Sequence, residues 1–177
     1  MNMSARQPTL FSKTARKWTL WVHVLSSSLW LGSALAMMIL TFAKGRSPTN
    51  AAELHAFCLC VKLIDDFVII ASCGVSALSG ILLSWKTPWG FFRYWWVAVK
   101  LCITVALLCV GAGLLGPWIN ETEALARTHG WAARELPRYQ TVEREVTVLG
   151  SVQLVILGFV LYASIFKPWG KTSSPGC

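Results

Sequence analysis

The sequence predicts an all-α membrane protein, a polytopic antiparallel bundle of four transmembrane helices. The 177 residues are 55% apolar and only 14% charged, whereas a soluble domain carries about a quarter charged residues. The apolar residues gather in four stretches, each close to the roughly 20 residues that a helix needs to cross a bilayer. Most connections between the stretches are short, which favours an up-down-up-down order.

The lipid bilayer is therefore the first partner that the sequence implies. We expect spans at about 18–42, 67–85, 95–118 and 146–166, within one transmembrane domain of residues 18–169. A basic tail (1–17) precedes this domain, and a short polar tail (170–177) follows it.

The first span has two features of a signal peptide, a basic flank and an Ala-x-Ala motif at Ala34–Ala36. Its apolar run of about 25 residues exceeds the 7–15 of a signal peptide core, so we expect the segment to be retained. Polar and bulky residues recur on it at steps of three or four, and they share one face that should look into the bundle. This face consists of His23, Ser26, Ser27, Trp30, Ser33, Met37 and Thr41.

The second helix is expected to begin near Asn50 or Ala51, after the helix breakers in "KGRSPTNAAE". It is then longer than a bilayer requires, so its first part projects outside or lies at the interface. On this part Lys62 can pair with Asp65 or Asp66 within the helix. Small residues at every fourth position of the span form a ridge that permits close packing, namely Ser72, Ser76 and Gly80.

The third connection, residues 119–141, is expected to be polar. "NETE" at its start resembles a capping signal, and the following apolar spacing predicts a short surface helix ended by Pro137. Acidic residues alternate with arginines there, as in a solvated loop. They are Glu121, Glu123, Glu135, Glu143 and Glu145.

The net charge of +8 comes mostly from Lys and Arg beside the spans, where such residues set topology and meet anionic headgroups. Their distribution predicts that both termini lie in the cytoplasm, and we expect the membrane to be a bacterial inner (plasma) membrane. The sequence has no basic helix, stacking platform or zinc pattern, so a nucleic-acid partner is not expected. It also has no nucleophile elbow, P-loop or dinucleotide fingerprint, and its six cysteines are not spaced as a disulfide framework.

Polar residues from different spans are expected at one depth of the membrane. His23 lies about 7–8 Å into the first span by helical rise, and Lys100 lies a similar distance into the third. Tyr162 approaches the same side on the last span, as do Ser79 and Gly80 on the second. Because a charge at the bilayer centre costs about 2.5–3.5 kcal/mol on insertion scales, intramembrane ionisable residues are functional candidates.

Each of these residues also has a purely structural interpretation. Lys100 can extend its methylenes toward the interface, and Tyr162 can belong to an aromatic belt. His23 can donate a hydrogen bond to a neighbouring helix. The functional and structural interpretations stay open at this point.

Short motifs resemble a known family. "HVLSSSLWLG" resembles the His–six residues–Trp–Gly-rich start of the HemJ-type protoporphyrinogen oxidases, and "WVAVKL" resembles their Trp-x-x-x-Lys-Leu entry to a later helix. "IFKPW" is similar to the end of their last span, although "MMILTFAKG" stands where they have a second histidine. The membrane domain of CopD-type copper proteins is similar too, as are related four-helix families of unknown function.

The HemJ-type resemblance implies haem b within the bundle and oxidation of a porphyrinogen, carried over at His23, Trp30 and Lys100. We therefore expect His23 to be an axial ligand of haem iron, for which a neutral imidazole is suited. Lys100, with Arg93, would face a propionate, and Trp30 and Tyr162 would line the pocket. An enzyme of this kind would be a haem-linked oxidoreductase that uses a porphyrin or a quinone.

Two alternatives remain. Soft thiolate and thioether ligands suit Cu(I), so a copper site of CopD type would use His55, Cys58, Met37 and Met38. Alternatively, the polar layer binds no cofactor and only fixes helix packing. The chain would then be a structural or accessory subunit that joins a second copy of itself or another membrane protein.

Overall fold

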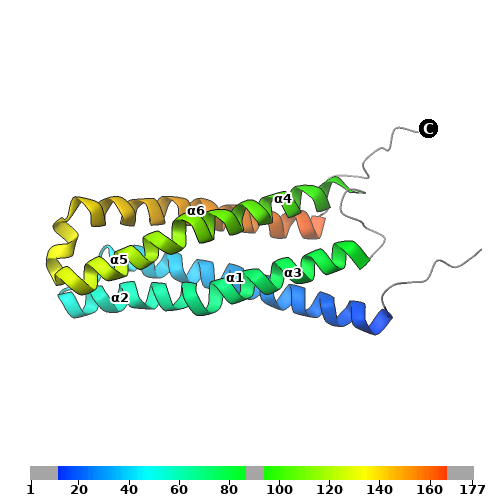
Figure 1. The fold of residues 1–177 in the computed structure, drawn as a ribbon, viewed down its shortest axis with the longest axis horizontal. Helices are drawn as coiled ribbons and strands as arrows, with labels where there is room; N and C mark the ends of the chain where they lie inside the picture. The colour runs from blue at the N-terminus through cyan, green and yellow to red at the C-terminus, as the bar shows by residue number, and fades with distance from the viewer. Residues whose placement is uncertain (1–11, 87–93, 167–177) are drawn as a thin grey trace, which may run out of the picture.

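The computed structural model describes residues 12–86 and 94–166, and its regular elements there are helices that form an elongated bundle of four rods (Figure 1). The first rod is α1 (Lys13–Lys44), and the second joins α2 (Ala51–Leu63), the π-helical turn η1 (Ile64–Ile69) and α3 (Ile70–Lys86). The third joins α4 (Trp95–Val110), the π-helical turn η2 (Gly111–Leu115) and α5 (Gly116–His129). A 3₁₀ segment, η3 (Gly130–Glu135), leads into the fourth rod, α6 (Pro137–Phe166). The predicted all-α four-helix fold is confirmed.

A polar cap fixes the start of the second rod. Asn50 Oδ1 accepts a hydrogen bond from the N–H of Glu53 at 3.0 Å. The carboxylate of Glu53 in turn accepts one from the N–H of Thr49 at 2.7 Å, an exchange similar to a capping box. The helix therefore begins at Ala51, as predicted.

The third rod corrects the prediction of a separate surface helix. α5 continues from the third span without a break, and Asn120, the predicted cap, lies in its interior. Pro117 lies in the first turn of α5 directly after η2, where a missing N–H is tolerated. The α-helix ends at Gly130, whose φ of 58° favours glycine. Pro137 then begins α6 instead of ending a helix, because its fixed φ suits a first helical position.

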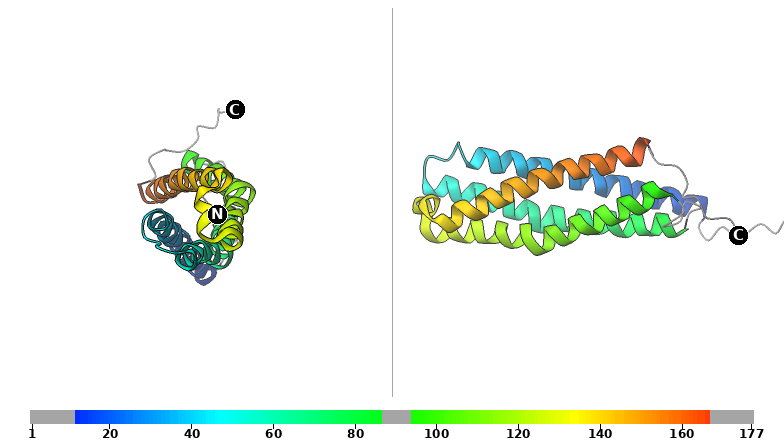
Figure 2. Two further views of the ribbon diagram at one scale, coloured as in Figure 1. Left: turned by 90° about the vertical axis from the view of Figure 1, so that its left-hand side faces the viewer. Right: turned by 90° about the horizontal axis from the view of Figure 1, so that it is seen from above.

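Each rod packs against two neighbours, in the order α1, α2–α3, α4–α5, α6 and back to α1 (Figure 2). α1 and α3 pack most closely, along the predicted ridge of small residues, and Ser72 and Ser76 are buried there. α2 and α5 also pack closely, whereas α3 and α4 touch only sparsely. The second and third rods are therefore joined firmly at one end of the bundle and loosely at the other.

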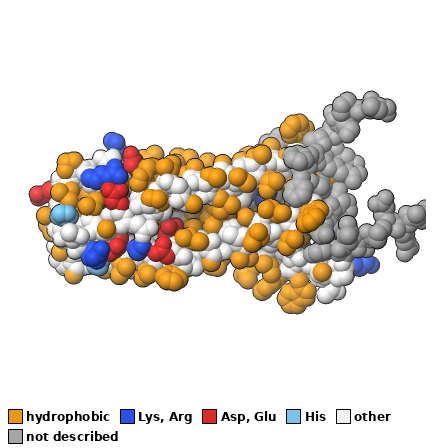
Figure 3. All heavy atoms as spheres, viewed as in Figure 1, with side chains coloured by type: hydrophobic (Ala, Val, Ile, Leu, Met, Phe, Trp, Pro, Cys, Tyr) orange, Lys and Arg blue, Asp and Glu red, His pale blue; other side chains and the backbone are white. Residues whose placement is uncertain are grey.

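Charged side chains gather at the end where α1 leads to α2 and α5 leads to α6, on the left in Figure 3. We call this end, residues 44–66 and 119–145, the head. The described residues contain four helices that are long and apolar enough to cross a membrane. α6 alone has 30 residues, about 45 Å of helix, against a hydrocarbon layer of about 30 Å. A helix of this length exceeds the hydrocarbon layer, so we expect the head to project from the membrane.

Apolar side chains fill the axis of the bundle from the head to the membrane interior. One cluster centres on Leu54, Cys58 and Tyr139, the next on Met37, Val61 and Ile119, and the third on Trp30, Leu107 and Leu157. Large apolar side chains also point outward from the spans, among them Val155, which is 73% exposed. An outward apolar surface of this kind is expected where lipid is the solvent.

Candidate functional site

The ring of His23 lies on α1, in the half of the bundle opposite to the head, and is held against α3. Its Nδ1 lies 3.0 Å from the carbonyl oxygen of Ser76 and 3.1 Å from Ser79 Oγ. A carbonyl oxygen can only accept, so Nδ1 carries a proton and donates it, and in a neutral ring Nε2 then holds the lone pair. The ring rests on Gly80, where an added Cβ would come within 3.1 Å of Cε1.

Serines complete the contact between α1 and α3. The hydroxyl oxygens of Ser27 and Ser76 lie 2.6 Å apart. Ser79 donates to the carbonyl of Val75 at 2.6 Å, so its oxygen is free to accept from the His23 ring. The polar face predicted for α1 is therefore turned into the bundle, and it meets the small-residue ridge of α3.

Lys100 reaches the same ring from α4. Its Nζ lies 3.5 Å from Nε2 of His23, at the long limit for a hydrogen bond. None of the ion pairs in the described part of the chain includes this ammonium. Arg93, expected to act beside Lys100, lies outside the described residues. We call His23, Ser76, Ser79, Gly80 and Lys100 the histidine layer.

Trp30 lies two helical turns further along the same face of α1. Its side chain is only 4% exposed, and it packs against Leu107 of α4 and Leu157 of α6. Its indole Nε1 is buried and has no acceptor among the residues that the structure describes. Buried N–H groups without a partner are uncommon in native proteins, so Trp30 is a candidate donor to a bound group.

Tyr162 does not join the histidine layer. Its ring is 48% exposed and packs between Phe159 and Phe166, at centroid distances of 6.4 and 4.6 Å. Ala163, the next residue, takes the inward position on α6 and is buried. Helical rise predicts the depth of a residue but not its direction around the helix axis, and Tyr162 turns outward from the bundle.

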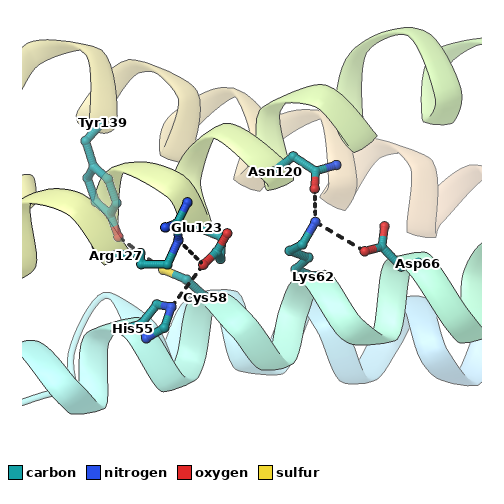
Figure 4. A network of polar contacts seen from close by, with 8 residues as sticks. All are labelled: His55, Cys58, Lys62, Asp66, Asn120, Glu123, Arg127 and Tyr139. Carbon is teal, nitrogen blue, oxygen red and sulfur yellow. Dashed lines mark hydrogen bonds and ion pairs between the residues drawn. The ribbon is translucent and has the colours of Figure 1, made fainter.

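Two residues of the copper alternative, His55 and Cys58, contact different partners in the head (Figure 4). His55 Nε2 lies 2.9 Å from Oε1 of Glu123. Cys58 is buried, and its Sγ lies 3.8 Å from the hydroxyl oxygen of Tyr139. Both side chains are therefore engaged in contacts between rods.

The two methionines of this alternative are buried in helix contacts. Met37 packs in the apolar cluster with Val61, and Met38 lies against α6, where a Cβ on Gly150 would come within 2.9 Å of its Sδ. In residues 12–86 and 94–166 no group of three or more His, Cys, Asp and Glu side chains could hold a metal ion. The geometry therefore gives no support to a copper site.

The head contains ion pairs between rods that the sequence did not reveal. The side chain of Lys44 is 3% exposed and its Nζ lies 3.6 Å from Glu143. Lys62 pairs with Asp66 at 3.2 Å, as predicted within one helix, and it also donates to Asn120 of α5 (Figure 4). The remaining pairs of carboxylates with arginines are Glu123–Arg127 and Glu121–Arg138.

Glu123 corrects the prediction that its segment is a solvated loop. It is only 8% exposed, because α5 continues through this segment and packs on α2. A spacing of three or four residues, from Leu115 through Ile119 and Thr122 to Ala126, was the signal for this buried face.

Comparison with models of known protein families gives a match over most of the chain. The model of a family described as "Predicted integral membrane protein (DUF2269)" matches residues 17–168, which include nearly all of the four rods. No curated protein and no solved structure matches the chain. The match and the four apolar helices together identify an integral membrane protein. The resemblance to the HemJ and CopD types stays a prediction.

Proposed function

The chain belongs to the DUF2269 family of predicted integral membrane proteins, and we propose that it binds haem b or a related porphyrin at the histidine layer, in a redox role. The observation that carries this proposal is the orientation of the His23 ring. Nδ1 donates to the backbone carbonyl of Ser76, which leaves the lone pair on Nε2, the side toward α4. A ring fixed through its other nitrogen in this way is typical of metal-bound histidines.

Two donors are suited to the carboxylates of a porphyrin, namely Lys100 beside the ring and Trp30 two helical turns further along α1. Lys100 has no carboxylate partner among the described residues, and the buried Nε1 of Trp30 has no acceptor there. Propionates would supply charged acceptors for such groups. Because the ammonium of Lys100 contacts Nε2, coordination at this nitrogen requires the flexible lysine chain to turn away. The sparse packing of α3 on α4 supports such a change on this side of the bundle.

Haem supplies one-electron redox chemistry when bound, with a potential set by axial ligation, hydrogen bonding and burial. In this proposal Ser76 and Ser79 hold the His23 ring in one tautomer, and Lys100 neutralises a propionate. The electron donor or acceptor would be a lipid-soluble porphyrin or quinone. The protein would lie in a bacterial inner membrane with both termini in the cytoplasm, which places the histidine layer in the cytoplasmic half.

The absorption spectrum of the full-length protein, purified after haem supplementation, tests the proposal. We expect a Soret band that is lost in His23→Ala and kept in His129→Ala, a variant of an exposed histidine of the head. Lys100→Met should keep the band but release haem more readily. A protein without the band, or an unaltered spectrum in His23→Ala, would contradict the proposal.

A different observation favours a second function. The hydrogen bonds of Ser27, Ser76 and His23 all join α1 to α3, so the same layer would suit a non-catalytic accessory subunit in which it only fixes helix packing. This function predicts a stoichiometric complex with another membrane protein and no chromophore. In that case His23→Ala should lower thermal stability and leave the absorption spectrum unchanged.

A further inference from the structure

An open groove lies between α5 and α6 at the border of the head. It has a volume of about 270 Å³ and is lined by Trp118, Arg144, Glu145, Val148 and Leu149. Trp118 and Leu149 pack against the apolar cluster around Met37, so the apolar floor of the groove is anchored in the core. Val148 is 58% exposed at the side of the groove.

The groove lies across the boundary between hydrocarbon and headgroups. The 21 residues from Val146 to Phe166 rise about 31 Å, which matches a hydrocarbon layer of about 30 Å. Arg144 and Glu145 precede this stretch directly, so they lie at headgroup level. Trp118 ends the third predicted span, a position where tryptophan settles at the membrane interface.

The two charged residues of the groove differ from most charged residues of the head because neither has an ion-pair partner among the described residues. Arg144 is exposed and Glu145 is half-buried. Arg138 is a nearby cation, but Glu121 already binds its guanidinium at 2.6 and 2.7 Å. One positive and one negative group thus remain available at the rim of an apolar groove.

We propose that this groove is a binding site for a zwitterionic phospholipid with a primary ammonium group, of the phosphatidylethanolamine class. One acyl chain lies on the apolar floor formed by Trp118 and Leu149. The phosphate accepts hydrogen bonds from the guanidinium of Arg144, and the ammonium donates to the carboxylate of Glu145. Phosphatidylcholine lacks ammonium N–H donors for Glu145, and phosphatidylglycerol has no cation for it. The site therefore distinguishes headgroups, and it does not depend on the haem proposal.

Native mass spectrometry of the delipidated full-length protein, titrated separately with dioleoyl phosphatidylethanolamine, phosphatidylcholine and phosphatidylglycerol, tests this site. We expect phosphatidylethanolamine to bind about tenfold more tightly than the other two lipids, the effect of one charge-assisted hydrogen bond. Arg144→Ala should weaken its binding about tenfold. Glu145→Gln should abolish its advantage over phosphatidylcholine and leave the binding of phosphatidylcholine unchanged.

Arg46→Ala is the matched control, because it removes an exposed arginine from the α1–α2 connection on the same side of the membrane. Thermal unfolding of each variant verifies that the fold is kept. Equal binding of the three lipids by the unchanged protein would overturn the proposal, as would a preference for phosphatidylglycerol. An identical loss of binding in Arg144→Ala and Arg46→Ala would also overturn it, since both would then report only net charge.

Discussion

The head and the histidine layer both bring ionisable side chains together, but they balance charge differently. In the head, Lys44 faces Glu143 and Lys62 faces Asp66. In the layer, Lys100 faces an imidazole and no carboxylate of the described residues. The layer lies on helices that are long and apolar enough to cross a membrane, where an unbalanced ammonium is more costly than at the charged end of the bundle. Balanced pairs are expected of a structural joint, whereas an unbalanced cation is expected of a site that an anionic ligand completes.

Lys44→Ala should have the largest effect, because it breaks a balanced pair in the head. The side chain is 3% exposed, and its Nζ also lies 5.8 Å from the centre of the Tyr139 ring. Removing one partner of a buried pair costs about 3 kcal/mol or more, so the free energy of unfolding in detergent should fall by about that amount. Lys44→Met combined with Glu143→Gln should restore most of it. A loss below about 1 kcal/mol would show that the pair behaves like an exposed one.

Lys100→Met and Lys62→Met compare the two regions directly. Methionine has a similar length and no charge, so Lys100→Met should stabilise the ligand-free protein by about 1–2 kcal/mol, through relief of an unbalanced charge in lipid. Lys62→Met should destabilise it by about 1–2 kcal/mol, because Asp66 and Asn120 lose their shared donor. Reversible unfolding measures both variants. Changes of the same sign would remove the proposed difference between the regions.

Gly80→Ala sharpens the comparison within the layer. An added Cβ would lie 3.1 Å from Cε1 of His23, whereas one on Gly74 of the same helix meets nothing within 4 Å. Gly74→Ala should therefore be neutral or stabilising, since alanine favours helix over glycine by about 1 kcal/mol. Gly80→Ala should be about 1–2 kcal/mol less stable than Gly74→Ala, because the His23 ring must move. Equal stabilities would mean that the ring is not held against α3.

The sequence predicts the four long apolar helices and the inward face of α1 well, because both depend on hydrophobic length and period. Ser26, Trp30, Ser33, Met37 and Thr41 are all buried, as their spacing predicts. Helical rise also brings residues of different spans to one depth, and the contact of the His23 ring with α4 agrees with it. Helical rise does not give the direction of a side chain around the helix axis. For this reason Tyr162 was expected to face the bundle interior, but its side chain lies on the outer surface of the bundle.

The parts that sequence reasoning missed depend on how the rods continue beyond the membrane. The third span was expected to end at Trp118 and to be followed by a separate surface helix, but η2 and α5 continue the same rod past this residue. Glu123 consequently lies on a packed face and pairs with His55 of α2. Contacts of this kind join residues 68 positions apart, and no local pattern in a single sequence predicts which carboxylate a distant cation will meet.

Arg138→Ala should have the smallest effect, because it removes an exposed pair of the head. Its guanidinium binds Glu121 at 2.6 and 2.7 Å in a two-point contact, but water and salt screen charges at such a surface. We expect a slight loss of thermal stability at low salt that disappears at about 1 M salt, where the Debye length falls to about 3 Å. Arg134→Ala is the control. Arg134 donates to the carbonyl of Gly45 at 2.9 Å and lies over the Trp131 ring. Because these contacts do not require a counter-charge, the loss of thermal stability in Arg134→Ala should persist at high salt. If the effect of Arg138→Ala also persists at high salt, packing between α5 and α6, and not charge, holds this pair.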